Sequence, residues 1–69
     1  MKRFAIKITK GDEYRILFVC DDKHTAMKAG LDFRRQYPRE EGLLACIEAD
    51  FDENGNMSGN GYRLHEVFM

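Results

Sequence analysis

The chain has 69 residues and a formal net charge of -1, with 43% hydrophobic and 33% charged residues, one proline and no tryptophan. This length holds one domain, over residues 1–69, and the apolar content excludes a disordered chain. The nearly balanced charge argues against an overall electrostatic role on DNA or on a membrane surface.

No stretch of the sequence has the pattern of a targeting or membrane segment. Lys2 and Arg3 resemble the start of a signal peptide, but Lys7 interrupts the apolar region that would have to follow. The longest uncharged apolar runs, 16–20 and 43–47, are too short to cross a bilayer. We therefore expect a cytoplasmic protein whose two cysteines are free thiols.

The first twenty residues have the pattern of a β-hairpin. Residues 2–9 alternate between apolar and polar side chains, as in a strand with one buried face. The turn residues Gly11 and Asp12 lead into a second strand over 14–20. This second strand is apolar on both faces, which is typical of a strand that is covered on both sides.

The stretch from Asp22 to Tyr37 has the clearest helical pattern. Asp22 suits the N-cap position, and Pro38 ends the helix because the residue before a proline is pushed out of the α region. The apolar stripe is formed by Ala26, Ala29, Gly30, Phe33 and Tyr37. A glycine inside a helix costs about 1 kcal/mol relative to alanine, so we expect close packing at Gly30 as the compensation.

Two further strands follow the helix. Residues 43–52 alternate, and a loop rich in asparagine and glycine over 53–60 leads to a strand over 62–68. This order of elements, ββαββ, predicts an α+β fold. The expected architecture is a four-stranded, mainly antiparallel sheet with one helix packed on one face. The order of the strands within the sheet stays open.

The apolar residues of the strands fall into two sets. We expect the core under the helix to contain Phe4, Ile6, Ile8, Ile16, Phe18, Phe33, Ile47, Phe51, Leu64 and Phe68. The opposite face then carries Leu17, Val19, Leu44 and Cys46. A contiguous apolar patch marks an interaction surface, so we predict a homodimer formed through these four residues or through a strand edge. The alternative is that long side chains such as Lys7, Arg15 and Arg63 cover this face.

Charge is distributed unevenly along the chain. Residues 23–39 hold five basic side chains against Asp32 alone, whereas residues 40–56 hold six acidic side chains and no basic one. We predict that the basic helix face, with Lys28, Arg35 and Arg39, binds an acidic protein partner. Nucleic acid is the alternative ligand, although the overall charge lacks the basic footprint of that class. Cations near a helix C-terminus also stabilise the helix itself.

One loop resembles a calcium site. Asp50, Asp52 and Asn54, followed by Gly55, have the spacing that opens a calcium-binding loop. The twelfth position is Gly61, where such a loop requires a bidentate glutamate. A plain hairpin loop explains the same residues, and whether it binds a cation stays open.

The cysteines and histidines lack the spacing of a zinc site. Cys20 and His24 are four residues apart, and Cys46 and His65 each stand alone. A disulfide between Cys20 and Cys46 is possible if their strands adjoin. No nucleophile has a base beside it, and no glycine-rich phosphate loop precedes a helix. We therefore expect no catalytic residue, metal or cofactor, and a small enzyme is only the third alternative.

The chain as a whole contains the segments RFAIKITKG, VCDDKHTAMKAG, GLLACIEADFDENGN and YRLHEVF. Together they resemble short bacterial open reading frames found in mobile elements of Gram-positive bacteria, to which no biochemical function is attached. The resemblance covers most of the chain and includes no catalytic motif. It implies a bacterial, cytoplasmic accessory protein, while the residues themselves predict a small non-enzymatic protein-interaction module.

Overall fold

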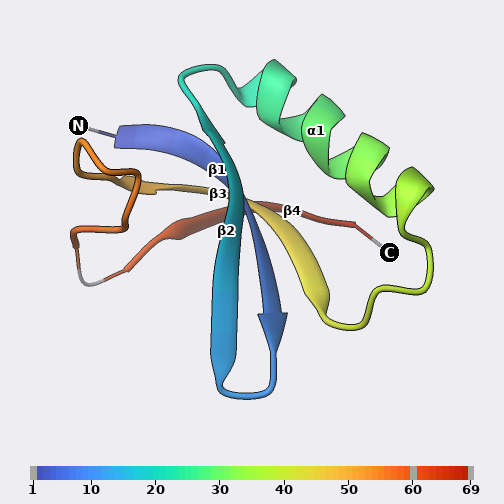
Figure 1. Ribbon diagram of the computed structural model, residues 1–69. Coiled ribbons are helices and arrows are strands. Elements are labelled where there is room, and N and C mark those ends of the chain that lie inside the picture. Colours follow the sequence, from blue (N-terminus) through green and yellow to red (C-terminus); the bar gives the residue numbers. More distant parts are fainter. Residues whose placement is uncertain (1, 60, 69) are drawn as a thin grey trace.

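The computed structural model describes residues 2–59 and 61–68. Strands β1 (Lys2–Lys10) and β2 (Glu13–Cys20) come first, then helix α1 (Lys23–Gln36), then strands β3 (Leu43–Asp50) and β4 (Arg63–Phe68). The strands form one antiparallel sheet in the order β2-β1-β3-β4. The helix lies across one side of this sheet (Figure 1). The predicted α+β, ββαββ fold is confirmed.

Helix α1 begins at the predicted N-cap. The Asp22 carboxylate accepts hydrogen bonds from the backbone N–H and the hydroxyl of Thr25, both at 2.8 Å. The backbone hydrogen bond from Thr25 lowers the pKa of Asp22 below its ordinary value. At the other end, the Tyr37 N–H donates to the Phe33 carbonyl, and Pro38 follows directly. The two ends of α1 therefore follow from local chemistry.

The helix packs on the sheet over a core of buried side chains. This core contains Ile6, Ile8, Ala26, Leu44, Cys46 and Phe68, with Phe4, Leu17, Cys20, Met27, Ala29 and Phe33 packed against it. Gly30 lets the helix come close to β4, because a Cβ at this position would lie 2.5 Å from ring atoms of Phe68. The expected close packing at Gly30 is thus a contact with Phe68.

The side of the sheet opposite α1, here called the far face, is covered in part by the chain that follows β3. Its buried cluster contains Ala5, Ala45, Ile47, Ala49 and Phe51, with Ile16, Val19, Met57 and Val67 packed against it. A β-bridge between Phe51 and Met57 folds this segment back on itself, and Figure 1 shows it away from the helix. Because Met57 packs on the cluster, the segment acts as a partial second layer.

Lys7 is buried on the far face, with 8% of its surface exposed. Its Nζ lies 4.1 Å from the centroid of the Tyr62 ring and 5.1 Å from that of Tyr14. An ammonium group over aromatic rings is stabilised by the ring quadrupoles, which offsets part of its desolvation. The alternative in which long side chains cover this face is therefore correct for Lys7.

The prediction of an exposed self-association patch formed by Leu17, Val19, Leu44 and Cys46 is wrong. Leu44 and Cys46 are fully buried under the helix, and Leu17 packs against the same core. Of the four, Val19 alone belongs to the far-face cluster. These side chains do not form one exposed patch, and three of the four are part of the core beneath α1.

A β-bulge in β2 explains why residues of this strand lie on other faces of the sheet than simple alternation predicts. Ile6 pairs with Phe18 and Lys7 pairs with Ile16, so Leu17 is an extra residue between two ladder positions. Side chains on either side of such a bulge point to opposite faces. Ile16 therefore lies on the far face, whereas Phe18 lies on the helix side.

The expected core is also wrong for three residues after the helix. Ile47 and Phe51 belong to the far-face cluster and not to the core under α1. Leu64 is 53% exposed. The reason in β3 is that Leu44 and Cys46, one residue out of phase with Ile47, supply the row that the helix covers.

Candidate interaction surface

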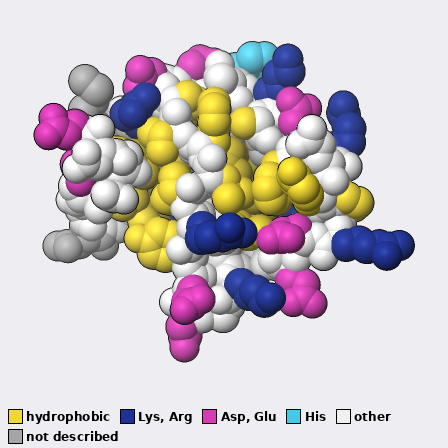
Figure 2. All heavy atoms as spheres, viewed as in Figure 1, with side chains coloured by type: hydrophobic (Ala, Val, Ile, Leu, Met, Phe, Trp, Pro, Cys, Tyr) yellow, Lys and Arg dark blue, Asp and Glu magenta, His cyan; other side chains and the backbone are white. Residues whose placement is uncertain are grey.

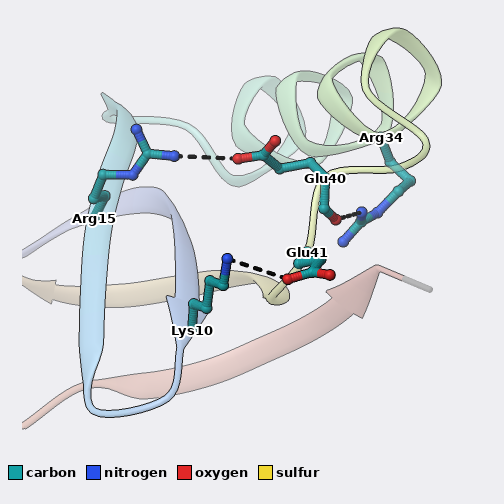
Figure 3. A network of polar contacts seen from close by, with 5 residues as sticks. All are labelled: Lys10, Arg15, Arg34, Glu40 and Glu41. Carbon is teal, nitrogen blue, oxygen red and sulfur yellow. Dashed lines mark hydrogen bonds and ion pairs between the residues drawn. The ribbon is translucent and has the colours of Figure 1, made fainter.

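The acidic residues after the helix are paired with the first hairpin. Glu40 Oε1 lies 3.4 Å from Arg15 Nη2, and Glu41 Oε2 lies 3.1 Å from Lys10 Nζ. Figure 3 shows both pairs, together with a 3.0 Å hydrogen bond from Arg34 Nη1 to the Glu40 backbone carbonyl. Exposed pairs of this kind add little stability. Because of these pairs, however, the carboxylates of Glu40 and Glu41 point toward the strands and not toward the cations of the helix.

The three predicted partner-binding residues are exposed. Lys28 and Arg35 lie two turns apart on α1, and Arg39 follows in the link to β3. Among the ion pairs of the described residues, none involves Lys28, Arg35 or Arg39. The structure therefore leaves this basic helix face without carboxylate partners in the described part of the chain.

A groove lies between α1 and β4, next to these cations. Its volume is about 390 Å³, and it is lined by Met27, Leu31, Arg34, Arg35, Glu66, Val67 and Phe68. The helical spacing of the first four residues places them on one side of α1. Leu31 is 54% exposed, whereas Phe68 is 6% exposed and lies deeper. The groove thus combines an apolar lining with two guanidinium groups and one carboxylate, that of Glu66.

Arg34 is held in place at this groove. Its Nη1 donates to the Glu40 carbonyl, and its buried Nε has no acceptor among the described residues. A guanidinium carries five N–H donors, so further donors remain for a ligand. Arg35 is the next residue and is exposed. Guanidinium groups bind carboxylates in a planar, bidentate manner, which makes an acidic ligand the best match for this pair.

Hydrophobic side chains also reach the surface elsewhere. In the view of Figure 2 they occupy the middle of the molecule, with basic and acidic side chains around them. On the far face, Tyr14, Leu43, Tyr62 and Leu64 are each about half exposed. A domain of this size cannot cover all of its apolar surface. The far face is therefore a second candidate surface, with residues that differ from those predicted.

The loop that resembles a calcium site is organised by its own backbone. The Asp52 Oδ1 atom accepts hydrogen bonds from the N–H groups of Asn54 at 2.9 Å and Asn56 at 3.0 Å. Within the ranges that the structure describes, no three histidine, cysteine or acidic side chains are gathered as a metal site. Aspartate commonly caps a turn in this way, so the contacts support the plain-loop interpretation.

The two cysteines are free thiols in strands that do not adjoin. β1 lies between β2, which carries Cys20, and β3, which carries Cys46. Two strand spacings amount to about 10 Å, which is beyond the reach of a disulfide. The condition for pairing them is therefore not met. Burial raises the pKa of the Cys46 thiol, which makes it a poor nucleophile.

The closest arrangement to an acid–base pair is formed by Glu48 and His65. The His65 Nε2 atom lies 3.0 Å from Glu48 Oε1, and its ring packs beside Phe4 with centroids 5.4 Å apart. His65 is the extra residue in a second bulge, between the pairs Cys46–Glu66 and Ile47–Leu64. Neither Glu48 nor His65 lines the groove beside α1. We interpret the pair as a contact that satisfies two polar side chains at the bulge.

The groove itself was not predicted from the sequence. Met27 and Leu31 are four residues apart, and this helical spacing was the available signal for one wall. The other wall could not be inferred because it requires β4 to be the strand beside the helix, and the strand order was open. Arg34 is one of the five basic residues of the stretch 23–39 but was not among the predicted partner-binding residues.

Comparison of the chain with protein-family models, curated protein sequences and solved structures finds no match. The resemblance to short bacterial open reading frames therefore stays a prediction. Across the described residues, no helix has both the length and the apolar character needed to cross a bilayer.

Proposed function

We propose that this chain is a small, non-enzymatic protein-interaction module that binds an acidic segment of a partner protein on the basic side of α1. The observation that carries the proposal is the placement of charge. Glu40 and Glu41 pair with the first hairpin, while Lys28, Arg35 and Arg39 have no ion pair among the described residues. Complementary charge speeds association and selects partners. The neighbouring groove supplies the apolar contact that charge alone does not give.

Nucleic acid is the alternative ligand for the same cations. Lysine and arginine supply non-specific affinity for phosphates, but this affinity normally requires a basic domain. The net charge here is -1, and the segment between β3 and β4, which carries Asp52 and Glu53, lies away from α1 (Figure 1). Those carboxylates repel a long polyanion, whereas a short acidic segment contacts the helix alone. The protein ligand is therefore the better match.

Self-association remains a second proposal, with the far face as its surface. Tyr14, Leu43, Tyr62 and Leu64 are the exposed apolar side chains there. Homodimers bury such self-complementary patches. Light scattering at high micromolar concentration tests this: a dimer that becomes a monomer in Leu64→Glu supports it, and a strictly monomeric wild-type chain contradicts it.

We place the proposed module in the cytoplasm. Cys20 and Cys46 are free thiols, and Cys46 is fully buried. Small secreted domains usually carry disulfides, whereas the cytoplasm keeps thiols reduced. Two free thiols in a domain of this size favour the reducing compartment.

The test of the proposed function is a comparison of two labelled probes by fluorescence anisotropy, an oligoglutamate peptide and a short DNA duplex. We expect the peptide to bind more tightly at physiological ionic strength. The double variant Lys28→Glu/Arg35→Glu should weaken peptide binding by about tenfold, equivalent to about 1.4 kcal/mol. The variant Lys2→Glu/Arg63→Glu changes the net charge equally and is the matched control. Tighter binding of the duplex would overturn the proposal in favour of nucleic acid.

A further inference from the structure

We propose that the partner segment binds as an added β-strand on the free edge of β4, with apolar side chains in the groove beside α1 and carboxylates on Arg34 and Arg35. This inference rests on the proposed function and deepens it. It states the conformation of the ligand, the strand that receives it, and the placement of apolar and acidic residues two apart on one face of the ligand.

The outer edge of β4 is open to another strand. β4 is the last strand of the order β2-β1-β3-β4, and within the described ranges it pairs with β3 alone. The ladder is regular over Leu44–Phe68, Ala45–Val67 and Cys46–Glu66, because the bulge lies before Glu66. An unpaired regular edge presents free N–H and C=O groups to an incoming chain. These edge residues are also the ones that line the groove.

The charge of the groove lining distinguishes β4 from the other edge strand. β2 and β4 each carry a bulge, so the regularity of the edge does not choose between them. A groove also lies between α1 and β2, but its charged lining residue is Asp32, which repels an acidic ligand. The groove beside β4 contains Arg34 and Arg35 against Glu66 alone. The charge of the lining therefore favours β4.

The groove matches alternate side chains of an added strand. Successive side chains of a strand point to opposite faces, so every second residue of the ligand faces the helix side. There Met27, Leu31 and Phe68 form an apolar lining within a volume of about 390 Å³. Arg34 and Arg35 lie on this same side, so a leucine for the lining and a glutamate for the arginines must be two residues apart in the ligand, and the residues between them face away. Backbone hydrogen bonds would give affinity and the groove would select the side chains, as in other complexes formed by strand addition.

Charge indicates a foreign acidic segment and not a second copy of this chain. Two copies joined through β4 would be related by a twofold axis, which places the same surface on both sides. Arg34 and Arg35 of each copy would then approach those of the other, together with Lys28 on the same helix, and these cations outnumber the single Glu66 that each copy contributes to the groove. Like charges across an interface are unfavourable. An acidic segment instead supplies the carboxylates that the guanidinium groups require.

The test uses a labelled peptide in which leucine and glutamate take turns at every second position, with serine between them, and two N-methylated forms of it. One form is methylated on the residues of one parity, and the other on the residues of the opposite parity. Because only one parity donates its N–H groups to β4, we expect one form to bind at least about tenfold more weakly and the other to bind as well as the parent. Equal binding of all three peptides would overturn the inference that the ligand binds as a β-strand, while leaving the proposed function intact.

Two leucines of equal exposure provide the matched variants. Leu31 is 54% exposed and lines the groove, whereas Leu43 is 55% exposed and lies on the opposite side of the sheet. Leu31→Ala should weaken binding of the parent peptide by about fivefold or more, because apolar contact is lost. Leu43→Ala should leave that binding unchanged. Binding of oligoglutamate without any gain from the leucines would also overturn the inference. Failure of every acidic peptide would overturn the proposed function as well, and a dimer dissociated by Leu31→Ala would show that the occupant is a second copy.

Discussion

Gly30 shows how one missing side chain sets the distance between helix and sheet. A Cβ added there would lie 2.5 Å from the Phe68 ring, so Gly30→Ala forces the ring or the helix to move. Overpacking costs about 1–3 kcal/mol, and the better helix propensity of alanine offsets about 1 kcal/mol of it. We expect a net loss of up to about 2 kcal/mol in the free energy of unfolding, measured by chemical denaturation.

The control for this prediction is a double-mutant cycle with Phe68→Leu. The smaller side chain removes the atoms that the new Cβ would meet, so Gly30→Ala should cost less in that background. An equal cost in both backgrounds would show that the contact between Gly30 and Phe68 is not the cause.

Asp22 makes the start of the helix sensitive to acid. The hydrogen bond from the Thr25 backbone N–H holds the pKa of Asp22 below its ordinary value of 3.8. A carboxylate with a lowered pKa in the folded state stabilises the fold above that ordinary value, and the contribution is lost as the pH falls through the folded pKa. We expect Asp22→Ala to lower the melting temperature at pH 7, with a smaller difference at pH values below 3.8.

Asp22→Asn separates the cap from the charge. Asparagine is as good an N-cap residue as aspartate and does not titrate. This variant should keep most of the stability at neutral pH and lose the acid dependence contributed by Asp22. A loss as large as that of Asp22→Ala would show that the negative charge, and not the hydrogen bond, stabilises the start of α1.

At the scale of the strand, two adjacent leucines show which face of β3 the helix covers. Leu44 is fully buried under α1, whereas Leu43 is 55% exposed on the far face. Leu44→Ala should cost about 2–5 kcal/mol because it leaves a cavity in the core. Leu43→Ala should cost about 0.5 kcal/mol or less, as surface substitutions usually do. Denaturant unfolding of both variants checks this. A larger loss of stability for Leu43→Ala than for Leu44→Ala would show that Leu43, and not Leu44, is the buried side chain.

The elements were predictable to different degrees for a physical reason. The ends of α1 follow from Asp22 and Pro38, which act on the local backbone. The faces of β2 depend on the bulge at Leu17, and a run in which Ile16, Leu17, Phe18 and Val19 are all apolar contains no signal for it. The placement of Leu44 and Cys46 depends on which row the helix covers, and this is a property of tertiary packing.

The candidate site was predictable only in part for the same reason. Exposed cations on a helix can be recognised from spacing, so Lys28 and Arg35 were found, with Arg39 beyond them. Their lack of ion-pair partners in the described chain depends on where Glu40 and Glu41 point. The groove depends on the neighbourhood of α1 and β4, which only the strand order decides.

At the scale of the whole molecule, the sheet has a cover on each side. The helix covers one side, and Phe51, Met57 and Tyr62 from the chain after β3 cover part of the other. The two clusters are small, and apolar side chains remain exposed around them. The groove beside β4 and the exposed part of the far face lie on different sides of the sheet. Ligand binding and self-association can therefore be separated by variants of single leucines.

The most direct test of the proposed interaction surface is an NMR titration of the ¹⁵N-labelled chain with the peptide that carries leucine and glutamate in turn at every second position. We expect the amide shifts to change in Glu66–Phe68 and in α1 from Met27 to Arg35, with much smaller changes at Tyr14 and Leu43. Shifts that change mainly on the far face, or not at all, would contradict the assignment of this surface to an acidic partner.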